Sequence, residues 1–351
     1  MAVKARKVSA PEPVLAVVRD APGGASASKR ERSRPGLGTS PGPIAPADHL
    51  AMAGRKAMWV HLDRLLAREP GVRDPERPDE LRRYRVATRR LRAAFRMFAP
   101  AFPDREVRPL RRGLAELADT VGLVRDLDNR ISDLNAWAIE RGPGSQAAVS
   151  PLLLAWSRER RRSARAFYEG LDSRRHRRLV KRLVRFVDVT APTRAPKQPT
   201  DLHTIGDRAA SMIWAAYEDV RAYAPVVRGA TVETLHDLRI STKRLRDDVE
   251  FLGAILGPQR AWLVVRLVEL QDHLGTLNDA AVAAKGVRTF LEDRHDRLAP
   301  EEQAELTVYL SDRERQIARL RRTSVQKWRP VVGIAFARQL ARLVVVPAGA
   351  A

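Results

Sequence analysis

The sequence predicts an all-α protein made of two four-helix bundles, and three observations lead to that prediction. From residue 47 onward, apolar residues recur with helical spacing, and no segment alternates apolar and polar residues as strands do. Hydrophobic residues make up 44% of the chain and aromatic residues only 5%, so we expect a core of mainly Leu, Val and Ala. The second half of the chain also repeats the pattern of the first.

Breaks rich in proline and glycine divide the 351 residues into four parts. Residues 1–46 hold Ala, Pro, Gly and Ser with scattered basic residues, which predicts a disordered basic arm. Residues 47–190 predict the first helical bundle, and residues 203–345 predict the second. The Pro-rich segment 191–202 is predicted to link them, so that the two bundles together form one domain.

The repeat rests on three matches that follow in the same order at nearly the same offset. Each match pairs the same kinds of residue, and three in order are hard to obtain by chance. The matched pairs are Leu81–Arg92 with Leu235–Arg246, Gly122–Asp126 with Gly275–Asp279, and Met58-Trp59 with Ile213-Trp214. We therefore infer two copies of one helical unit.

The charge balance indicates an acidic partner. The chain has 64 Lys and Arg against 42 Asp and Glu, a formal net charge of +22. It has no cysteine, which excludes disulfides, a thiolate zinc site and a cysteine nucleophile. No apolar run, Leu343–Val346 included, is long enough to span a bilayer, and no secretory signal is recognisable. We therefore expect a cytoplasmic protein without membrane insertion.

Basic residues form one stripe on a predicted helix in each half. In the first half Arg82, Arg85, Arg89, Arg92 and Arg96 fall within an arc of roughly 80°. In the second half His236, Arg239, Lys243 and Arg246 occupy the corresponding arc. Apolar residues lie opposite both stripes, while Arg90 and Arg244 lie at the edges and widen them. The same division of the helix surface thus occurs twice.

The stripe of the first half indicates anion binding. Charge runs on helices usually form a solvated face, where opposite charges alternate at a spacing of four residues. No acidic residue lies between Arg82 and Arg96, so we expect the like charges to repel one another unless an anion offsets them. Guanidinium groups suit phosphate oxygens, and one cation per turn, about 5.4 Å, suits a polymer of phosphates.

A second basic helix follows in each half and is expected to face the same groove. Cations that line one groove with low-dielectric walls produce a strong positive potential. The residues concerned are Arg158, Arg161, Arg162 and Arg165 in the first half, and Arg315, Arg319 and Arg322 in the second.

These residues resemble the CHAD family, the conserved histidine α-helical domain, over about residues 47–345. The resemblance rests on the spacing of His236, Arg239, Lys243 and Arg246, on its first-half copy, and on Arg125-Asp126 and Asn278-Asp279 downstream. It implies two four-helix bundles related by a pseudo-twofold axis, around a basic cavity or pore that binds inorganic polyphosphate, and association with polyphosphate granules. The family pattern has a histidine where this chain has Arg82, which still suits phosphate but argues against a symmetric metal site.

Acidic residues near the stripes have a supporting role in this prediction. We expect Asp126 and Asp279 to orient basic side chains of a neighbouring helix, although a surface acid or helix cap is an equal alternative. No carboxylate or histidine spacing predicts a metal site, and no known catalytic motif is present, so neither a cofactor nor catalytic residues are predicted.

The sequence thus predicts a non-enzymatic polyphosphate-binding protein of unknown oligomeric state. The first alternative is non-specific, weak binding of nucleic acid, although the stripes lack the aromatic residues that stack on single strands. The second is an enzyme that acts on polyphosphate with Mg²⁺ or Mn²⁺, and the third is a scaffold that coats storage granules.

Overall fold

The computed structural model describes residues 36–74, 77–188 and 203–344. Within these ranges every regular element is a helix, apart from an isolated bridge between His49 and Thr204. The helices of the first half are α2 (Leu50–Arg68), η3 (Glu69–Arg73), α3 (Pro78–Phe98), η4 (Ala99–Ala101), α4 (Asp104–Arg141), α5 (Pro143–Ala148), α6 (Ser150–Asp172) and α7 (Arg174–Val187). Those of the second half are α8 (Ile205–Arg221), α9 (Val232–Phe251), α10 (Gly253–Leu256), η6 (Pro258–Arg260), α11 (Ala261–Arg294), η7 (His295–Arg297), α12 (Pro300–Val332) and α13 (Ile334–Val344).

Helix α3 shows how the first half is built from its sequence. Proline stands at its first position and Asp79 and Glu80 in its first turn, where acidic side chains complement the helix dipole. Tyr84, Leu91 and Phe95 are fully buried on its apolar face. This face packs within a group formed by α2, α3, α4, α6 and α7, so the opposite, basic face is left outside the core.

The second half places α9 in the same way. Thr231 caps α9, because its hydroxyl accepts a hydrogen bond from the backbone N–H of Thr234 at 3.2 Å. Leu238, Leu245 and Val249 are fully buried, as the sequence predicts for the apolar face. Helix α9 packs between α8 and α11, and α11 in turn packs along α12.

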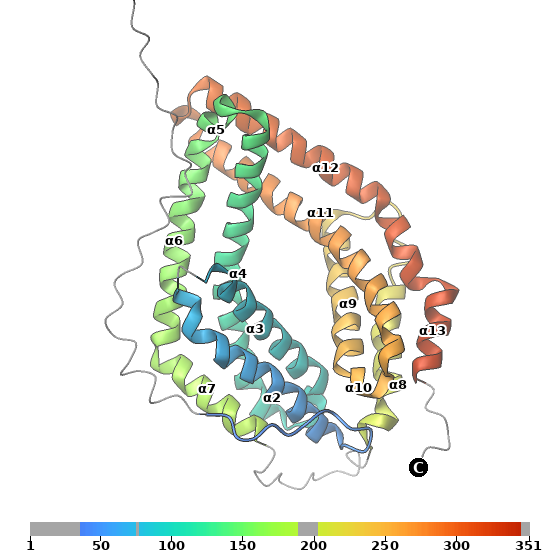
Figure 1. The fold of residues 1–351 in the computed structure, drawn as a ribbon. Helices are drawn as coiled ribbons and strands as arrows, with labels where there is room; N and C mark the ends of the chain where they lie inside the picture. Colours follow the sequence, from blue (N-terminus) through green and yellow to red (C-terminus); the bar gives the residue numbers. More distant parts are fainter. Residues whose placement is uncertain (1–35, 75–76, 189–202, 345–351) are drawn as a thin grey trace, which may run out of the picture.

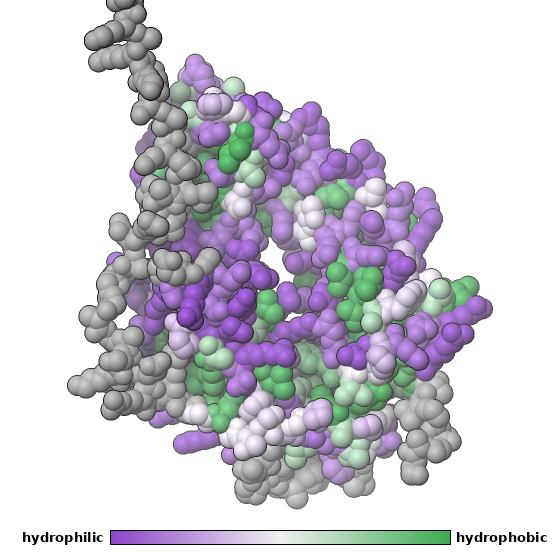
Figure 2. All heavy atoms as spheres, viewed as in Figure 1, coloured by the Kyte–Doolittle hydropathy of each residue, from purple (hydrophilic) through white to green (hydrophobic). Residues whose placement is uncertain are grey.

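The two halves lie side by side and meet at two separate places (Figure 1). At one place α3 contacts α9. At the other, α4 and α5 contact α12, where Trp137 donates to Asp312 at 2.8 Å and Tyr309 donates to Asp133 at 2.6 Å. Between these contacts the surface is hollowed, and the rim of the hollow is largely hydrophilic (Figure 2).

The segment before α2 also joins the halves. The backbone N–H of Ile205, at the start of α8, donates to the carbonyl of Asp48 at 2.7 Å, and Lys56 donates to the carbonyl of Pro43 at 3.1 Å. Ile44 is buried in the main core. These residues therefore make defined contacts where the sequence predicted part of a disordered arm, and residues 1–35 of that arm lie outside the described residues.

The all-α fold predicted from the sequence is confirmed. Both halves present their long helices in the same order, with α2, α3, α4 and α6 followed by α8, α9, α11 and α12. The duplication itself, its division into two four-helix bundles and the linker at 191–202, most of which lies outside the described residues, stay predictions. No helix in the described ranges has the length and apolar character to cross a bilayer.

Candidate anion-binding site

Helices α3 and α9 bring four basic side chains together at their junction. Arg85 and Arg89 come from α3, and Arg239 and Lys243 come from α9; we call these four residues the central cluster. Lys243 is close enough to the other three for each of them to disfavour its positive charge. The two basic stripes predicted from the sequence therefore converge in space, although they are far apart along the chain.

Lys243 is the most perturbed member of the central cluster. Burial is the largest cause that lowers the pKa of its ammonium group to about 7, and the charges of Arg89, Arg239 and Arg85 contribute to this shift, while Asp247 acts in the opposite direction. In the described ranges this ammonium group makes no hydrogen bond or ion pair. Lys243 therefore has a partly buried ammonium group that no acceptor in the described part of the protein binds.

Arg89 is in a similar position on α3. Burial lowers the pKa of its guanidinium group, the nearby Asp247 raises it, and Arg90, Arg85 and Arg246 lower it. Its Nε atom is buried and has no hydrogen-bond partner in the described part of the chain. Such an unsatisfied donor is costly, and it is suited to an acceptor that comes from outside the protein.

Polar side chains from the long helices α4 and α11 contact one residue of each stripe, Arg85 on α3 and His236 on α9. Arg85 donates to Asp126 of α4 at 3.0 Å, so Asp126 has the orienting contact that the sequence predicted. In the second half, Asn278 of α11 makes the corresponding contact, because its Oδ1 lies 2.7 Å from Nδ1 of His236. Asp279 is exposed, and the only hydrogen bond of its side chain in the described ranges is a long one of 3.5 Å from the Asn278 amide.

The role of Asn278 was missed from the sequence. The prediction assigned the orienting role in the second half to Asp279, the residue that matches Asp126 of the first half. The adjacent amide performs it instead, since a carboxamide oxygen accepts from a histidine N–H as a carboxylate does. The match between Arg125-Asp126 and Asn278-Asp279 contained the signal, but it did not show which residue of each pair faces the stripe.

Two residues expected in the binding stripe make ion pairs with carboxylates of the other half. Arg90 donates to Asp247 of α9 at 2.6 Å and also binds Glu250, and Arg96 donates to Asp248 at 2.5 Å. The expectation that the stripe of α3 has no carboxylate partners is therefore wrong for these two residues, and also for Arg82 and Arg85, which pair with Asp79 and Asp126. Asp79 lies on α3 before Arg82, and the other acids come from other helices, so none of them lies between Arg82 and Arg96 in the sequence. We call the contacts of Arg90 and Arg96 the seam.

The remaining stripe residues differ in how strongly they are bound by the protein. Arg246 donates to Glu250 at 2.8 Å and to Gln271 at 3.0 Å, so its guanidinium group is largely satisfied. Arg82 makes an exposed ion pair with Asp79 at 3.3 Å. Arg92 and Arg244 are exposed and make no hydrogen bond or ion pair within the described ranges.

The second basic helices lie farther from the junction of α3 and α9. Helix α6 packs against α4, α5 and α7, and α12 packs against α11, α5 and α13. In the described ranges no hydrogen bond or ion pair joins their predicted binding residues to α3 or α9. Two of these residues have acidic neighbours, since Arg165 pairs with Glu169 and Arg315 pairs with Asp312. The others, which are Arg158, Arg161, Arg162, Arg319 and Arg322, are exposed.

The arrangement can hold a multiply charged anion at the junction of α3 and α9. The central cluster offers guanidinium and ammonium donors, and no group of three or more metal-ligating side chains occurs among the described residues. A divalent cation would be repelled by the four positive charges, whereas phosphate oxygens would be attracted.

Comparison with known proteins agrees with these features. The sequence model of the CHAD domain matches residues 56–288. The fold is similar to the crystal structure of the CHAD domain from the plant Ricinus communis, with a TM-score of 0.65 and 20% sequence identity over 89% of this chain and 98% of that one. It is also similar to PptA from Streptomyces chartreusis, with a TM-score of 0.65 and 18% identity over 80% of this chain and 99% of that one. No curated protein matches the sequence significantly.

Proposed function

Because the chain belongs to the CHAD domain family, we propose that it binds inorganic polyphosphate at the junction of α3 and α9 and does not convert it. The central cluster supplies the principal contacts. Its positive charge supports binding over catalysis, since phosphoryl transfer normally requires Mg²⁺ and the cluster would repel that ion.

One observation carries this proposal, which is the convergence of Arg85, Arg89, Arg239 and Lys243 from two helices. Four like charges at one place repel each other, and this repulsion adds to the effect of burial in lowering the pKa of Lys243. A bound polyanion offsets this repulsion. The complex therefore regains part of the stability that the repulsion removes from the free protein. A neutral or cationic ligand would not recover it.

The residues that flank the central cluster extend the proposed site along both helices. They are Arg82 and Arg92 on α3, and His236, Arg244 and Arg246 on α9. Arg90 and Arg96 are left out of this set, because their guanidinium groups already bind the carboxylates of the seam. The exposed arginines of α6 and α12 extend the positive surface for a longer polymer.

The proposal is tested by removing charge from the central cluster. Arg89→Gln with Lys243→Gln removes two of the three members that have no hydrogen-bond acceptor in the described ranges, and should weaken polyphosphate binding about 100-fold. Arg338→Gln with Arg342→Gln removes the same charge from exposed positions on α13 and should change affinity less than about threefold. Affinity is measured by calorimetry with polyphosphate of defined length, and helicity by circular dichroism.

Equal affinity losses in the two double variants would refute the proposed site. They would show that net charge alone determines binding. Loss of affinity in the central variant with unchanged helicity would support it, because removing two mutually repelling charges should not destabilise the fold.

Non-specific nucleic-acid binding is the alternative that this charge also allows. Competition separates the two, since the proposal requires polyphosphate to displace DNA at far lower phosphate concentration than DNA displaces polyphosphate. Release of inorganic phosphate from polyphosphate in the presence of Mg²⁺ or Mn²⁺ would instead reveal an enzyme.

We further propose that polyphosphate binding takes the protein to polyphosphate granules in the cytoplasm. A fluorescent fusion should co-localise with stained granules, and the Arg89→Gln/Lys243→Gln variant should be diffuse. Granule association of that variant would indicate that another part of the chain directs it there.

A further inference from the structure

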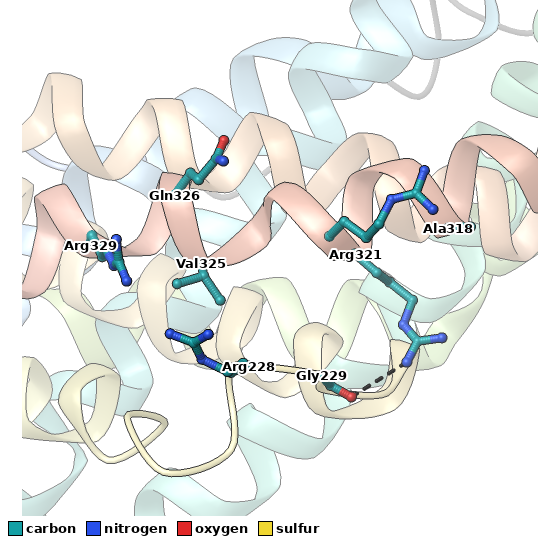
Figure 3. Close-up of a pocket in the computed structure, with 8 residues that line it drawn as sticks. Arg228, Gly229, Ala318, Arg321, Val325, Gln326 and Arg329 are labelled. Atoms are coloured by element: carbon teal, nitrogen blue, oxygen red, sulfur yellow. Dashed lines mark hydrogen bonds between the residues drawn. The ribbon is translucent and has the colours of Figure 1, made fainter.

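A second basic concavity lies on the second half, away from the central cluster. It is a cleft of about 600 Å³ between α12 and the loop that joins α8 to α9 (Figure 3). Four arginines line it, which are Arg228 on the loop and Arg321, Arg322 and Arg329 on α12. No acidic residue lines it, and it shares no residue with the central cluster. We call it the outer cleft.

Hydrogen bonds to the backbone fix the walls of the outer cleft. Arg321 donates from Nε to the carbonyl of Ala230 at 3.0 Å, and it also reaches the carbonyl of Gly229 at 3.5 Å. Gly229 has a φ of +77°, which suits glycine and turns the loop toward α9. Trp328 holds α12 to the end of α8, since its indole N–H donates to the carbonyl of Val220 at 3.2 Å.

The other three arginines of the outer cleft are exposed. In the described ranges no carboxylate lies within ion-pair distance of Arg228, Arg322 or Arg329. Figure 3 shows Arg228 and Arg329 reaching from the loop and from α12 to the same side of Val325. One guanidinium group therefore anchors the loop, and three remain available on the surface of the cleft.

The lining of the outer cleft suits a compact, highly charged anion. Guanidinium groups bind phosphate oxygens in pairs of hydrogen bonds, and the amide of Gln326 adds a neutral donor at the same surface. Pockets for small ligands usually measure about 300 to 1,000 Å³, and this volume lies in that range. Val325 and Ala318 are the apolar side chains of the lining, beside the four arginines.

A neighbouring cleft of about 540 Å³ continues the positive surface along α12. Arg322 lines both clefts, and Arg319 extends the second one toward the start of the helix. Asp312 limits the second cleft, because it binds Arg315 and Trp137 there. The outer cleft is therefore the part of this surface that has cations and no acid.

We propose that the outer cleft is a second phosphate-binding site, which takes a short linear run of phosphates such as a triphosphate. The inference goes beyond the proposed function, because this ligand would be bound by residues that do not belong to the central cluster. A triphosphate can come from a short free polyphosphate or from a nucleotide, and both carry the chemistry that three arginines recognise.

Arginine-selective labelling tests the site directly. The full chain is treated with phenylglyoxal with and without tripolyphosphate, and labelling of Arg228 and Arg329 is measured by mass spectrometry. We expect saturating tripolyphosphate to protect both residues at least fivefold and to leave the exposed Arg338 unprotected. A parallel sample with ATP and no Mg²⁺ identifies the source, since protection by both ligands indicates any triphosphate, and protection by tripolyphosphate alone indicates a free phosphate chain. Protection by neither ligand would overturn the inference.

Variants make the test independent of the central cluster. Arg228→Gln with Arg329→Gln should lower the number of tripolyphosphate molecules bound per chain, measured by equilibrium dialysis, while binding at the central cluster persists. Arg89→Gln with Lys243→Gln should leave the protection of Arg228 and Arg329 unchanged. Wild-type stoichiometry and affinity in the Arg228→Gln/Arg329→Gln variant would overturn the second site, whatever the outcome at the central cluster.

Discussion

At the scale of single residues, Lys243 connects burial to binding. Its ammonium group is partly buried beside three arginines, and its pKa is lowered to about 7. Near neutral pH a substantial fraction of the free protein therefore has an uncharged Lys243. A bound polyanion favours the charged form, so it raises the pKa and the complex takes up a proton.

We therefore predict that polyphosphate affinity increases as pH falls from about 8.5 to 6.5. At pH 8, Lys243 should take up about one proton when polyphosphate binds. Titration calorimetry in two buffers with different ionisation enthalpies measures the uptake. Lys243→Arg keeps the positive charge but does not titrate in this pH range, so the variant should lack the proton uptake at this position. The terminal phosphates of the ligand contribute the same uptake in the wild type and in the variant. Identical uptake in both proteins would contradict the assignment.

For single residues, the sequence predicted which side chains are buried but not which side chains of other helices they contact. Helical spacing placed Tyr84 and Leu91 in the core and Arg85 and Arg89 on the opposite face, because burial and periodicity are local properties of one helix. The partners of Arg90 and His236 come from other helices, and the sequence does not encode such contacts in any local pattern. The contacts of Asn278 with His236 and of Asp247 with Arg90 are therefore seen only in the structure.

At the scale of elements, α3 carries arginines with two different tasks. Arg90 faces α9, where it binds Asp247 and Glu250 in the seam, whereas Arg92 is exposed and has no ion-pair partner in the described ranges. The side chain of Asp247 is only 5% exposed. Removing Arg90 leaves this buried carboxylate without its hydrogen-bonded cation, whereas removing Arg92 breaks no ion pair in the described ranges.

Arg90→Gln should therefore lower the free energy of unfolding by about 3 kcal/mol. Arg92→Gln should lower it by less than about 0.5 kcal/mol, yet weaken polyphosphate binding. Urea denaturation measures stability and calorimetry measures affinity. Equal stability losses in the two variants would contradict the division between seam and binding residues.

At the scale of the whole molecule, the two halves meet at the seam and again where α4 and α5 contact α12. A separate apolar core, which includes Leu134, Trp137, Leu306 and Tyr309, supports the second contact. The two contacts fix the distance between α3 and α9, so the convergence of the central cluster depends on the complete chain. The positive surface continues from that cluster along both helices.

Salt dependence should report how much of this surface a ligand uses. By analogy with single-stranded nucleic acid, each phosphate contact contributes about −0.7 to the slope of log affinity against log salt concentration. A short polyphosphate on the central cluster alone should give a slope of about −3, and a long one that also reaches the flanking residues should give about −6. A slope that does not change with chain length would show that the flanking residues take no part.

Glu250 is shared between two arginines, Arg90 in the seam and Arg246 in the binding stripe. A phosphate that binds Arg246 must compete with this carboxylate. The affinity at that position therefore depends on how much more strongly Arg246 binds the phosphate than the Glu250 carboxylate. Ligand binding at the stripe and the contact between the two halves therefore both depend on the Glu250 carboxylate. A change in one of these two equilibria consequently alters the other.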